Sequence, residues 1–269
     1  MPRPRRSTLR TIAYAAGALL SCVPLAASSA RAGDLSLGLQ SGMYRPQVTD
    51  PLDATESISD TSFFLSPIVD LTFGRFGVTT KYIYSNYVYE GVGSPDTLPG
   101  GQTSINRNAQ KHDLDGAVKY SLFLSNEFPF AVTPFVGVRY ELQNVTDGVP
   151  TRVGPEIEVA KADYTILSAI TGATFSYTFR DLGLTPYAVG SVYVYSLVDA
   201  SKGVDLPPNP NGFGGFAVEG GLSYSLYSLL QAPVSFTASY RYQRIEPEKF
   251  KEEIQQAIGG VFYHFVDFF

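Results

Sequence analysis

The 269-residue sequence has no tryptophan, one cysteine and little charge, with Asp, Glu, Lys and Arg making up only 17% of it. A single cysteine, Cys22, cannot form an intramolecular disulfide. No segment after residue 32 reaches the ~18 uninterrupted apolar residues expected of a transmembrane helix. Phenylalanine and tyrosine are abundant instead, with 18 of each. The composition therefore excludes a disulfide scaffold and a helical membrane protein, and its aromatic richness must be explained in another way.

The first 32 residues have the pattern of a cleavable secretory leader. Arginines at positions 3, 5, 6 and 10 are followed by the apolar stretch IAYAAGALL at 12–20, and Ala30-Arg31-Ala32 has the small-x-small form of a cleavage site. The apolar stretch is shorter than the ~20 residues that a membrane-spanning helix needs. We therefore predict a signal peptide over residues 1–32 and a mature chain of residues 33–269.

Cleavage at this point would change both the charge and the chemistry of the chain. The leader takes Cys22 and five of the 20 Lys and Arg residues with it, so that 15 basic residues remain against 25 acidic ones. A net charge of about −10 argues against nucleic acid as a partner, because nucleic-acid-binding surfaces are basic. With Cys22 removed, the mature chain has no thiol nucleophile and no Cys-ligated metal. We also predict no cofactor, no other metal site and no catalytic residue.

Apolar and polar residues alternate along ten segments of the mature chain. Within residues 234–243, Phe236, Ala238, Tyr240 and Tyr242 share one parity, and Ser, Thr, Arg and Gln occupy the other. Successive side chains of a strand point to opposite faces, so this pattern predicts a strand with one apolar and one polar face. The ten segments are residues 34–44, 62–73, 76–89, 112–125, 130–143, 162–177, 184–197, 213–227, 234–243 and 257–269.

Two of these segments have less regular patterns. In the sixth, Ile166 and Phe175 have opposite parity, and a β-bulge would explain such a change because one extra residue reverses the facing of everything after it. In the seventh, aromatic and branched side chains occupy one parity and small residues the other. We predict that the aromatic and branched side chains face outward and the small residues face inward. That assignment turns Tyr187, Val189, Tyr193 and Tyr195 outward and Ala188 and Gly190 inward.

The connections between the segments alternate in length. Those after the second, fourth, sixth and eighth segments are short, at residues 74–75, 126–129, 180–183 and 229–233. The others are long and rich in proline, glycine or charge, and include residues 90–111, 198–212 and 246–256, which we interpret as solvated loops. A strict alternation of short and long connections is typical of an up-and-down barrel that spans a membrane.

These features together resemble the Gram-negative outer-membrane β-barrel proteins, and among them a small porin-like barrel. Such barrels commonly end in a strand whose last residue is Phe and which carries aromatics two residues apart, and Tyr263, Phe265 and Phe269 fit that pattern. The resemblance implies an all-β, antiparallel, up-and-down transmembrane β-barrel of about ten strands, with short periplasmic turns and long external loops. It further implies location in the cell outer membrane, contact with outer-membrane lipid and lipopolysaccharide, and recognition of the last strand by the barrel-insertion machinery.

Charged residues with inward parity are the candidate functional residues of such a barrel. The set comprises Asp70, Lys81, Asp115, Lys119, Arg139, Glu141, Glu219 and Arg241. In a narrow lumen they would pair with one another, because an unpaired buried charge costs several kcal/mol. In a wider lumen they would select small polar or charged solutes. Ten strands lie near the size at which side chains fill the interior.

The sequence therefore predicts a non-enzymatic barrel with two alternative roles. The first is a narrow passive channel for small polar solutes. The second is a structural or surface-interaction barrel whose lumen is closed by salt bridges and which acts through its external loops.

A third hypothesis, an outer-membrane hydrolase, rests on His112-Asp113-x-Asp115 at the external end of the fourth segment. Ten-stranded outer-membrane proteases place acidic residues and histidine at that position to activate water. They also need a second such pair, and the only other histidine, His264, lies near the opposite end. The hydrolase hypothesis is accordingly the weakest of the three.

Overall fold

A computed structural model describes residues 33–49, 56–59, 61–92, 104–122, 129–145, 149–153, 156–160, 164–200, 214–246 and 251–265. The predicted leader, Cys22 and the terminal Phe269 lie outside the described residues. Within the described ranges, no helix is long and apolar enough to cross a bilayer.

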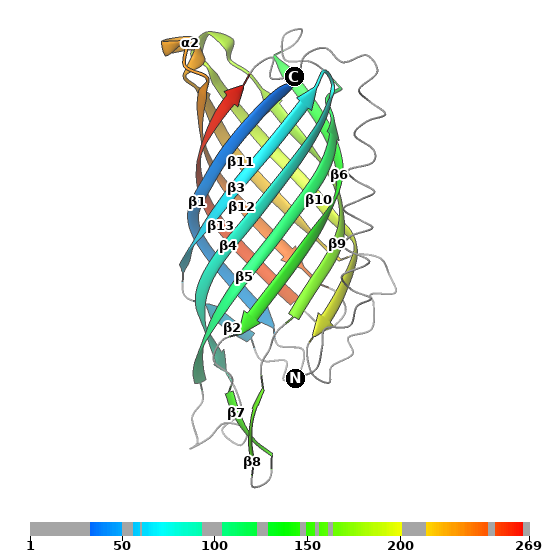
Figure 1. The fold of residues 1–269 in the computed structure, drawn as a ribbon, viewed down its shortest axis with the longest axis vertical. Helices are drawn as coiled ribbons and strands as arrows, with labels where there is room; N and C mark the ends of the chain where they lie inside the picture. The colour runs from blue at the N-terminus through cyan, green and yellow to red at the C-terminus, as the bar shows by residue number, and fades with distance from the viewer. Residues whose placement is uncertain are drawn as a thin grey trace.

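Ten long strands form a closed antiparallel barrel (Figure 1). Each strand pairs with its neighbours in chain order, and the last strand pairs with the first, which closes the sheet. The short strand β2 (Glu56–Ser59) continues the path of β3 between β1 and β4. The predicted all-β up-and-down barrel is confirmed. Its strands are β1 (Asp34–Thr49), β3 (Ser62–Phe73), β4 (Phe76–Val92), β5 (Ser104–Tyr120), β6 (Phe130–Val145), β9 (Tyr164–Tyr177), β10 (Leu184–Ala200), β11 (Gly215–Ser225), β12 (Val234–Ile245) and β13 (Lys251–Phe265).

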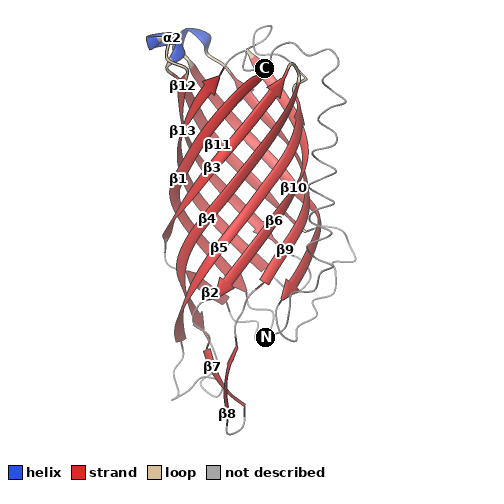
Figure 2. Cartoon of the chain, in the orientation of Figure 1, coloured by secondary structure: helices blue, strands red, loops and turns tan. Residues whose placement is uncertain are grey.

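The two ends of the barrel differ in their connections, and we call them the short-turn end and the long-loop end. At the short-turn end, β3 and β4 are joined by Gly74 and Arg75, and Gly74 has the positive φ of 60° that a tight turn requires. The short helices η3 (Arg180–Leu182) and α2 (Tyr227–Leu230) make two further turns there. At the long-loop end, β7 (Val149–Val153) and β8 (Glu156–Ala160) pair with each other in a hairpin that projects beyond the barrel (Figure 2).

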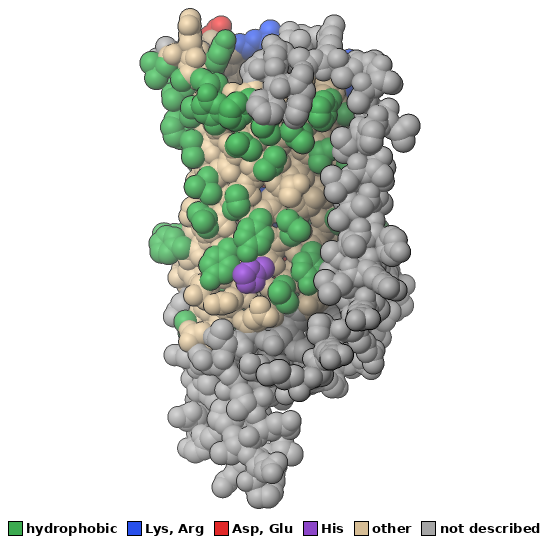
Figure 3. Space-filling view, in the orientation of Figure 1, with side chains coloured by type: hydrophobic (Ala, Val, Ile, Leu, Met, Phe, Trp, Pro, Cys, Tyr) green, Lys and Arg blue, Asp and Glu red, His purple; other side chains and the backbone are tan. Residues whose placement is uncertain are grey.

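The outer face of the barrel carries an apolar band. Hydrophobic side chains gather over this face (Figure 3), and Val136, for example, is 60% exposed there. On β1 the outward apolar residues run from Leu35 to Met43. Nine residues at ~3.3 Å each, tilted by ~45°, span about 21 Å, close to the ~25 Å apolar band of a transmembrane barrel. The band therefore has the height of a bilayer core.

The band ends where outward-facing charges begin. Towards the long-loop end, Arg244 on β12 pairs with Glu246 and, at 3.6 Å, with Glu253 on β13. Lys251 lies 3.2 Å from the same Glu253. Strands β4 and β5 continue past this level, because their pairing extends to Val92 and Ser104. The barrel wall thus projects out of the apolar band at the long-loop end.

The observed facing of β10 is the reverse of the predicted one. Tyr187, Val189 and Tyr193 point into the lumen, whereas Ala188 and Gly190 lie on the exposed outer face. Counting tyrosine as a purely apolar residue predicts the opposite facing. Tyrosine also has a hydroxyl that needs a partner when buried, and this favours the polar side of the wall. The side chain of Tyr195 is outside the described residues.

The β-bulge predicted within residues 162–177 is absent from β9, so that prediction is wrong. β9 pairs with β6 without interruption, and its Ile166 and Ile170 face the lumen throughout. The irregularity is in β10, where Tyr193 and Tyr195 oppose consecutive residues of β9 and Val194 is the extra residue. The change of parity in the sequence of β9 therefore arises because apolar residues lie on its inner face as well as on its outer face.

Two segments predicted as solvated loops are partly strand. β13 begins at Lys251, inside the predicted loop 246–256, and β4 and β5 cover half of 90–111. Their charged residues resemble those of a loop in sequence, but Lys111 and Glu252 are buried in the lumen and pair with each other. Charged residues that the sequence predicts to be exposed to solvent are therefore buried, because they pair with one another inside the barrel.

Candidate functional site in the barrel lumen

Side chains from five strands meet in the lumen towards the long-loop end and form what we call the closed layer. All of its members are at most 2% exposed, so solvent does not reach them. The layer consists of Lys111, Asp113, Arg139, Glu141, Tyr193, Gln243 and Glu252.

Arg139 is the centre of the closed layer. Its Nη2 donates to Asp113 Oδ2 at 2.7 Å and to Glu141 Oε2 at 3.2 Å. Its Nη1 donates to Gln243 Oε1 at 2.6 Å and to the Tyr193 hydroxyl at 3.2 Å. One guanidinium group therefore joins strands β5, β6, β10 and β12, which suits the planar fork of arginine.

Lys111 extends the network to the last strand. Its Nζ lies 2.7 Å from Glu141 Oε1 and also pairs with Glu252 on β13. Glu141 thus receives both cations of the layer. Buried charges are tolerated when each one has an ionic partner and hydrogen bonds, and Lys111 and Arg139 have both.

Apolar side chains fill the lumen around the closed layer. One buried cluster contains Tyr44, Phe64, Ile83, Tyr87, Ala109, Ile254 and Ile258, and a second contains Ile166, Tyr193, Ala217 and Ile245. Both clusters face inward, which is unusual for a lumen lined with water. At this level the described side chains pack like a protein core.

The Tyr193 hydroxyl gives a direct test of this packing. It accepts from Arg139 and donates to Gln243 Oε1 at 2.9 Å. We expect Tyr193→Phe to lower the free energy of unfolding by about 1–2 kcal/mol, because a buried network loses a hydrogen-bonding group. Urea unfolding of the refolded barrel measures the change. Tyr224→Phe, on the outer face of β11, is the matched control and should leave stability unchanged; equal effects of the two would contradict the structural role.

Towards the short-turn end the lumen is more accessible. Lys119 pairs with Asp70 there, and the two side chains remain 25% and 26% exposed. His264 lies between Ser36 and Ser235, with each ring nitrogen 2.8 Å from one hydroxyl oxygen. The contrast in exposure indicates that solvent enters the lumen from this end and stops at the closed layer.

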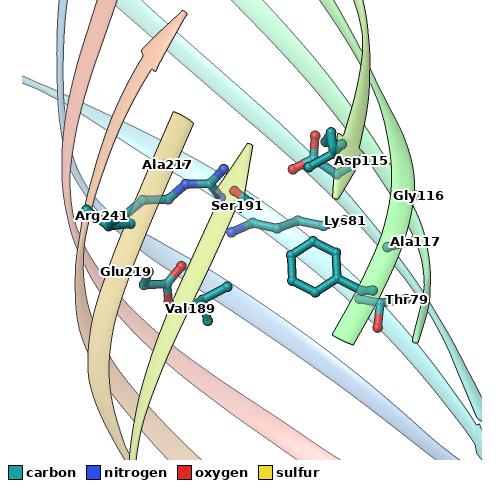
Figure 4. A pocket seen from close by; sticks show the side chains of 13 residues that line it. Thr79, Lys81, Asp115, Gly116, Ala117, Val189, Ser191, Ala217, Glu219 and Arg241 are labelled. Atoms are coloured by element: carbon teal, nitrogen blue, oxygen red, sulfur yellow. The ribbon is translucent and has the colours of Figure 1, made fainter. Parts of the chain in front are cut away.

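A cavity of about 150 Å³ lies between these two levels. Four charged side chains line it, Lys81 from β4, Asp115 from β5, Glu219 from β11 and Arg241 from β12, together with Ser191 from β10 (Figure 4). The structure therefore places all eight sequence-selected charges on the inner face, but in three separate levels. Asp70 and Lys119 form one, Arg139 and Glu141 belong to the closed layer, and the remaining four line the cavity.

Several residues of the closed layer were not among the sequence candidates. Lys111 and Glu252 fall in segments that the sequence predicts to be loops, and Gln243 and Tyr193 carry no charge. Asp113 has inward parity, but its sequence neighbour His112 suggests a hydrolytic pair instead. A signal was nevertheless present, because Lys111, Asp113, Asp115 and Lys119 share one parity along β5.

The His112-Asp113 pair does not form a site. Asp113 points into the lumen and binds Arg139, whereas His112 lies on the outer face, where its Nδ1 is 2.7 Å from the Tyr82 hydroxyl. Consecutive strand residues face opposite sides of the wall, so these two side chains cannot act together on one water molecule. Among the described residues, no group of three or more His, Cys, Asp and Glu side chains is placed to hold a metal ion.

Several solved outer-membrane barrels match this chain in a comparison of structures. The outer-membrane protease OmpT of Escherichia coli is 9% identical, with 87% of this chain and 96% of that one covered and a TM-score of 0.48. The β domain of the Bordetella autotransporter BrkA is 14% identical, with 87% and 99% covered and a TM-score of 0.48. Neisserial surface protein A is 14% identical, with 85% and 96% covered and a TM-score of 0.34. No family model and no curated protein matches the sequence.

At these identities and TM-scores the likeness carries no argument about this chain, and no residue role is transferred from these proteins. The strand order, the closure of β13 on β1 and the apolar outer band define the fold independently of them. The chain has the fold of the outer-membrane β-barrel proteins.

Proposed function

We propose that this protein is an outer-membrane barrel whose lumen is held closed by a salt-bridged layer and whose working surface is the long-loop end. The closed layer is the observation that carries this proposal, because its charged side chains are paired and at most 2% exposed. A passive channel needs a hydrated path through the same level. We assign no catalytic residue and no cofactor to the barrel.

The apolar band supports placement in the outer membrane. Its height matches a bilayer core, and a closed barrel leaves no unpaired strand edge in lipid. In this proposal the band contacts outer-membrane lipid and lipopolysaccharide, and residues 1–32 direct export as a cleaved signal peptide. The barrel-insertion machinery recognises the last strand through the segment that ends at Phe269.

The long-loop end has features that suit contact with other molecules. The wall extends beyond the apolar band on β4 and β5, and the β7–β8 hairpin projects further still (Figure 1). Binding residues are often carried on such extensions of a rigid scaffold. In this proposal the closed lumen makes the barrel a rigid scaffold and does not transport solutes.

Bilayer recordings test whether the lumen is closed. We expect the refolded mature protein, inserted in a planar bilayer at neutral pH, to show no stepwise conductance above the lipid baseline. Disruption of the layer by the double substitution Lys111→Ala and Glu252→Ala should produce steps, because it removes two of the side chains that fill the lumen. Reproducible steps from the unsubstituted protein would contradict the proposal.

The second candidate is a narrow channel for small polar solutes, and the 150 Å³ cavity favours it. Four charged side chains face that cavity, as they would in a selectivity constriction. A channel that uses it would also have to pass the closed layer, so that layer would act as a gate. Steps from the unsubstituted protein whose reversal potential changes with Arg241→Met would support this candidate over the first.

A further inference from the structure

Lys81 and Arg241 are the two cations of the lumen cavity, and neither forms an ion pair with a carboxylate among the described residues. Arg241 uses Nη2 to donate to Gln243 at 3.1 Å and, weakly, to the Tyr193 hydroxyl at 3.4 Å. Its Nε is buried and has no hydrogen-bond partner. The other lumen cations, Lys111, Lys119 and Arg139, are all ion-paired.

The two carboxylates at the cavity do not form ion pairs with Lys81 or Arg241 among the described residues. Asp115 Oδ1 lies 3.8 Å from Arg139 Nε, which is too long for a hydrogen bond, and it has no hydrogen-bond partner in the described part of the chain. Glu219 Oε1 accepts hydrogen bonds from the Tyr187 hydroxyl at 3.1 Å and the Ser239 hydroxyl at 2.9 Å. The closed layer itself contains three acids and two bases. The cavity therefore holds two cations and two carboxylates, and its two cations have no carboxylate within ion-pair distance among the described residues.

The cavity groups are accessible to a ligand. Lys81, Ser191 and Arg241 are all partly exposed, and the Asp115 side chain is 19% exposed, in contrast to the closed layer. Small residues such as Thr79 and Ala117 line part of the cavity wall. A small solute can therefore approach from the short-turn end, while the closed layer blocks the other side.

We propose that this cavity is a binding site for a small oxyanion of the carboxylate or phosphate type. Lys81 and Arg241 reach into it from different walls, and the Ser191 hydroxyl faces the same space (Figure 4). An arginine fork, an ammonium and a hydroxyl are the donors that carboxylate and phosphate oxygens accept from. At about 30 Å³ per water, 150 Å³ holds about five waters, which is room for an ion of this size and little more.

This site is independent of the proposed closure of the barrel. It lies on the short-turn side of the closed layer and needs no path through it. Bilayer recordings decide whether the lumen is open, and equilibrium binding decides whether the cavity holds an anion. The failure of one proposal would leave the other standing.

Calorimetric titration of the refolded mature barrel in detergent tests the site, with inorganic phosphate as the probe and acetate as a second, planar oxyanion. We expect saturable binding of at least one of the two to the unsubstituted protein. Lys81→Met and Arg241→Met should each weaken it about tenfold or more, because each removes a charge-assisted hydrogen bond. Lys119→Met, which removes a lumen cation already paired with Asp70, is the matched control and should bind normally.

Glu219→Gln makes the opposite prediction. It removes the nearest competing negative charge while keeping a side chain of the same shape, so it should bind the same anion more tightly than the unsubstituted protein. Circular dichroism of each variant verifies that the barrel has folded. The absence of saturable binding of either anion to the unsubstituted protein would overturn the site. Equal weakening by Lys119→Met, or weaker binding to Glu219→Gln, would also overturn it.

Discussion

Replacing Arg139 by alanine should lower the free energy of unfolding by about 3–5 kcal/mol, the cost expected when one partner is removed from a buried ionic network. Arg139 is the only described side chain that contacts Asp113, Glu141 and Gln243 together. Without it, Asp113 keeps no ion-pair partner within the described part of the chain, and Glu141 keeps Lys111 alone. Urea unfolding of the refolded barrel, followed by circular dichroism, measures the difference.

Arg244→Ala is the matched control for Arg139→Ala. Arg244 also pairs with two carboxylates, but it lies on the outer rim and is 34% exposed. Its removal should cost about 0–1 kcal/mol, as is typical of exposed ion pairs. If Arg139→Ala proved as mild as this control, the closed layer would have to be hydrated, and the channel would become the better proposal.

Introducing arginine at Thr171 should destabilise the barrel by roughly 2–4 kcal/mol, whereas the same change at Thr174 should cost about 0–1 kcal/mol. Both threonines belong to β9, but Thr171 faces outward at the level of Val136 and Val192, in the middle of the apolar band. Thr174 faces the lumen in its more accessible half. The comparison keeps residue type and strand constant and changes only the face.

Unfolding in a lipid bilayer system, with detergent micelles avoided, measures this difference. In micelles the outward arginine can reach water more easily, which would reduce its cost. A larger loss of stability for Thr174→Arg than for Thr171→Arg would mean that the inner and outer faces of the barrel have been exchanged.

The fold was predictable because the physical signal repeats in every strand. Outward parity along β3, β6, β11 and β12 is occupied by Leu, Val, Phe and Tyr, and a reversal in one strand would not hide the pattern. The prediction was wrong where a residue type suits both faces. Tyr187 and Tyr193 have rings that suit lipid and hydroxyls that suit the lumen, so their facing depends on partners such as Glu219 and Gln243, which lie in other strands.

The candidate site was predictable only in part for a related reason. Parity identified Arg139 and Glu141 as inward, but which charge meets which depends on the stagger of strands far apart in sequence. Lys111 and Glu252 cannot be recognised as lumen residues from sequence, because a charged strand end resembles a loop until its partner strand is known. No local rule would have separated the unpaired Lys81 from the paired Lys119, since both lie on inward positions near a short turn.

The pairing of Lys111 with Glu252 also bears on the order in which the barrel assembles. The two residues are 141 positions apart, on β5 and on β13, the last strand of the barrel. Contacts between such distant parts of a chain form late, because a long loop must close before they can contribute. Sealing of the interior is therefore coupled to the arrival of the final strand. A nascent sheet that still lacks β13 keeps a water-accessible Lys111, and the completed barrel gains its last ionic contact in the step that joins its two edges.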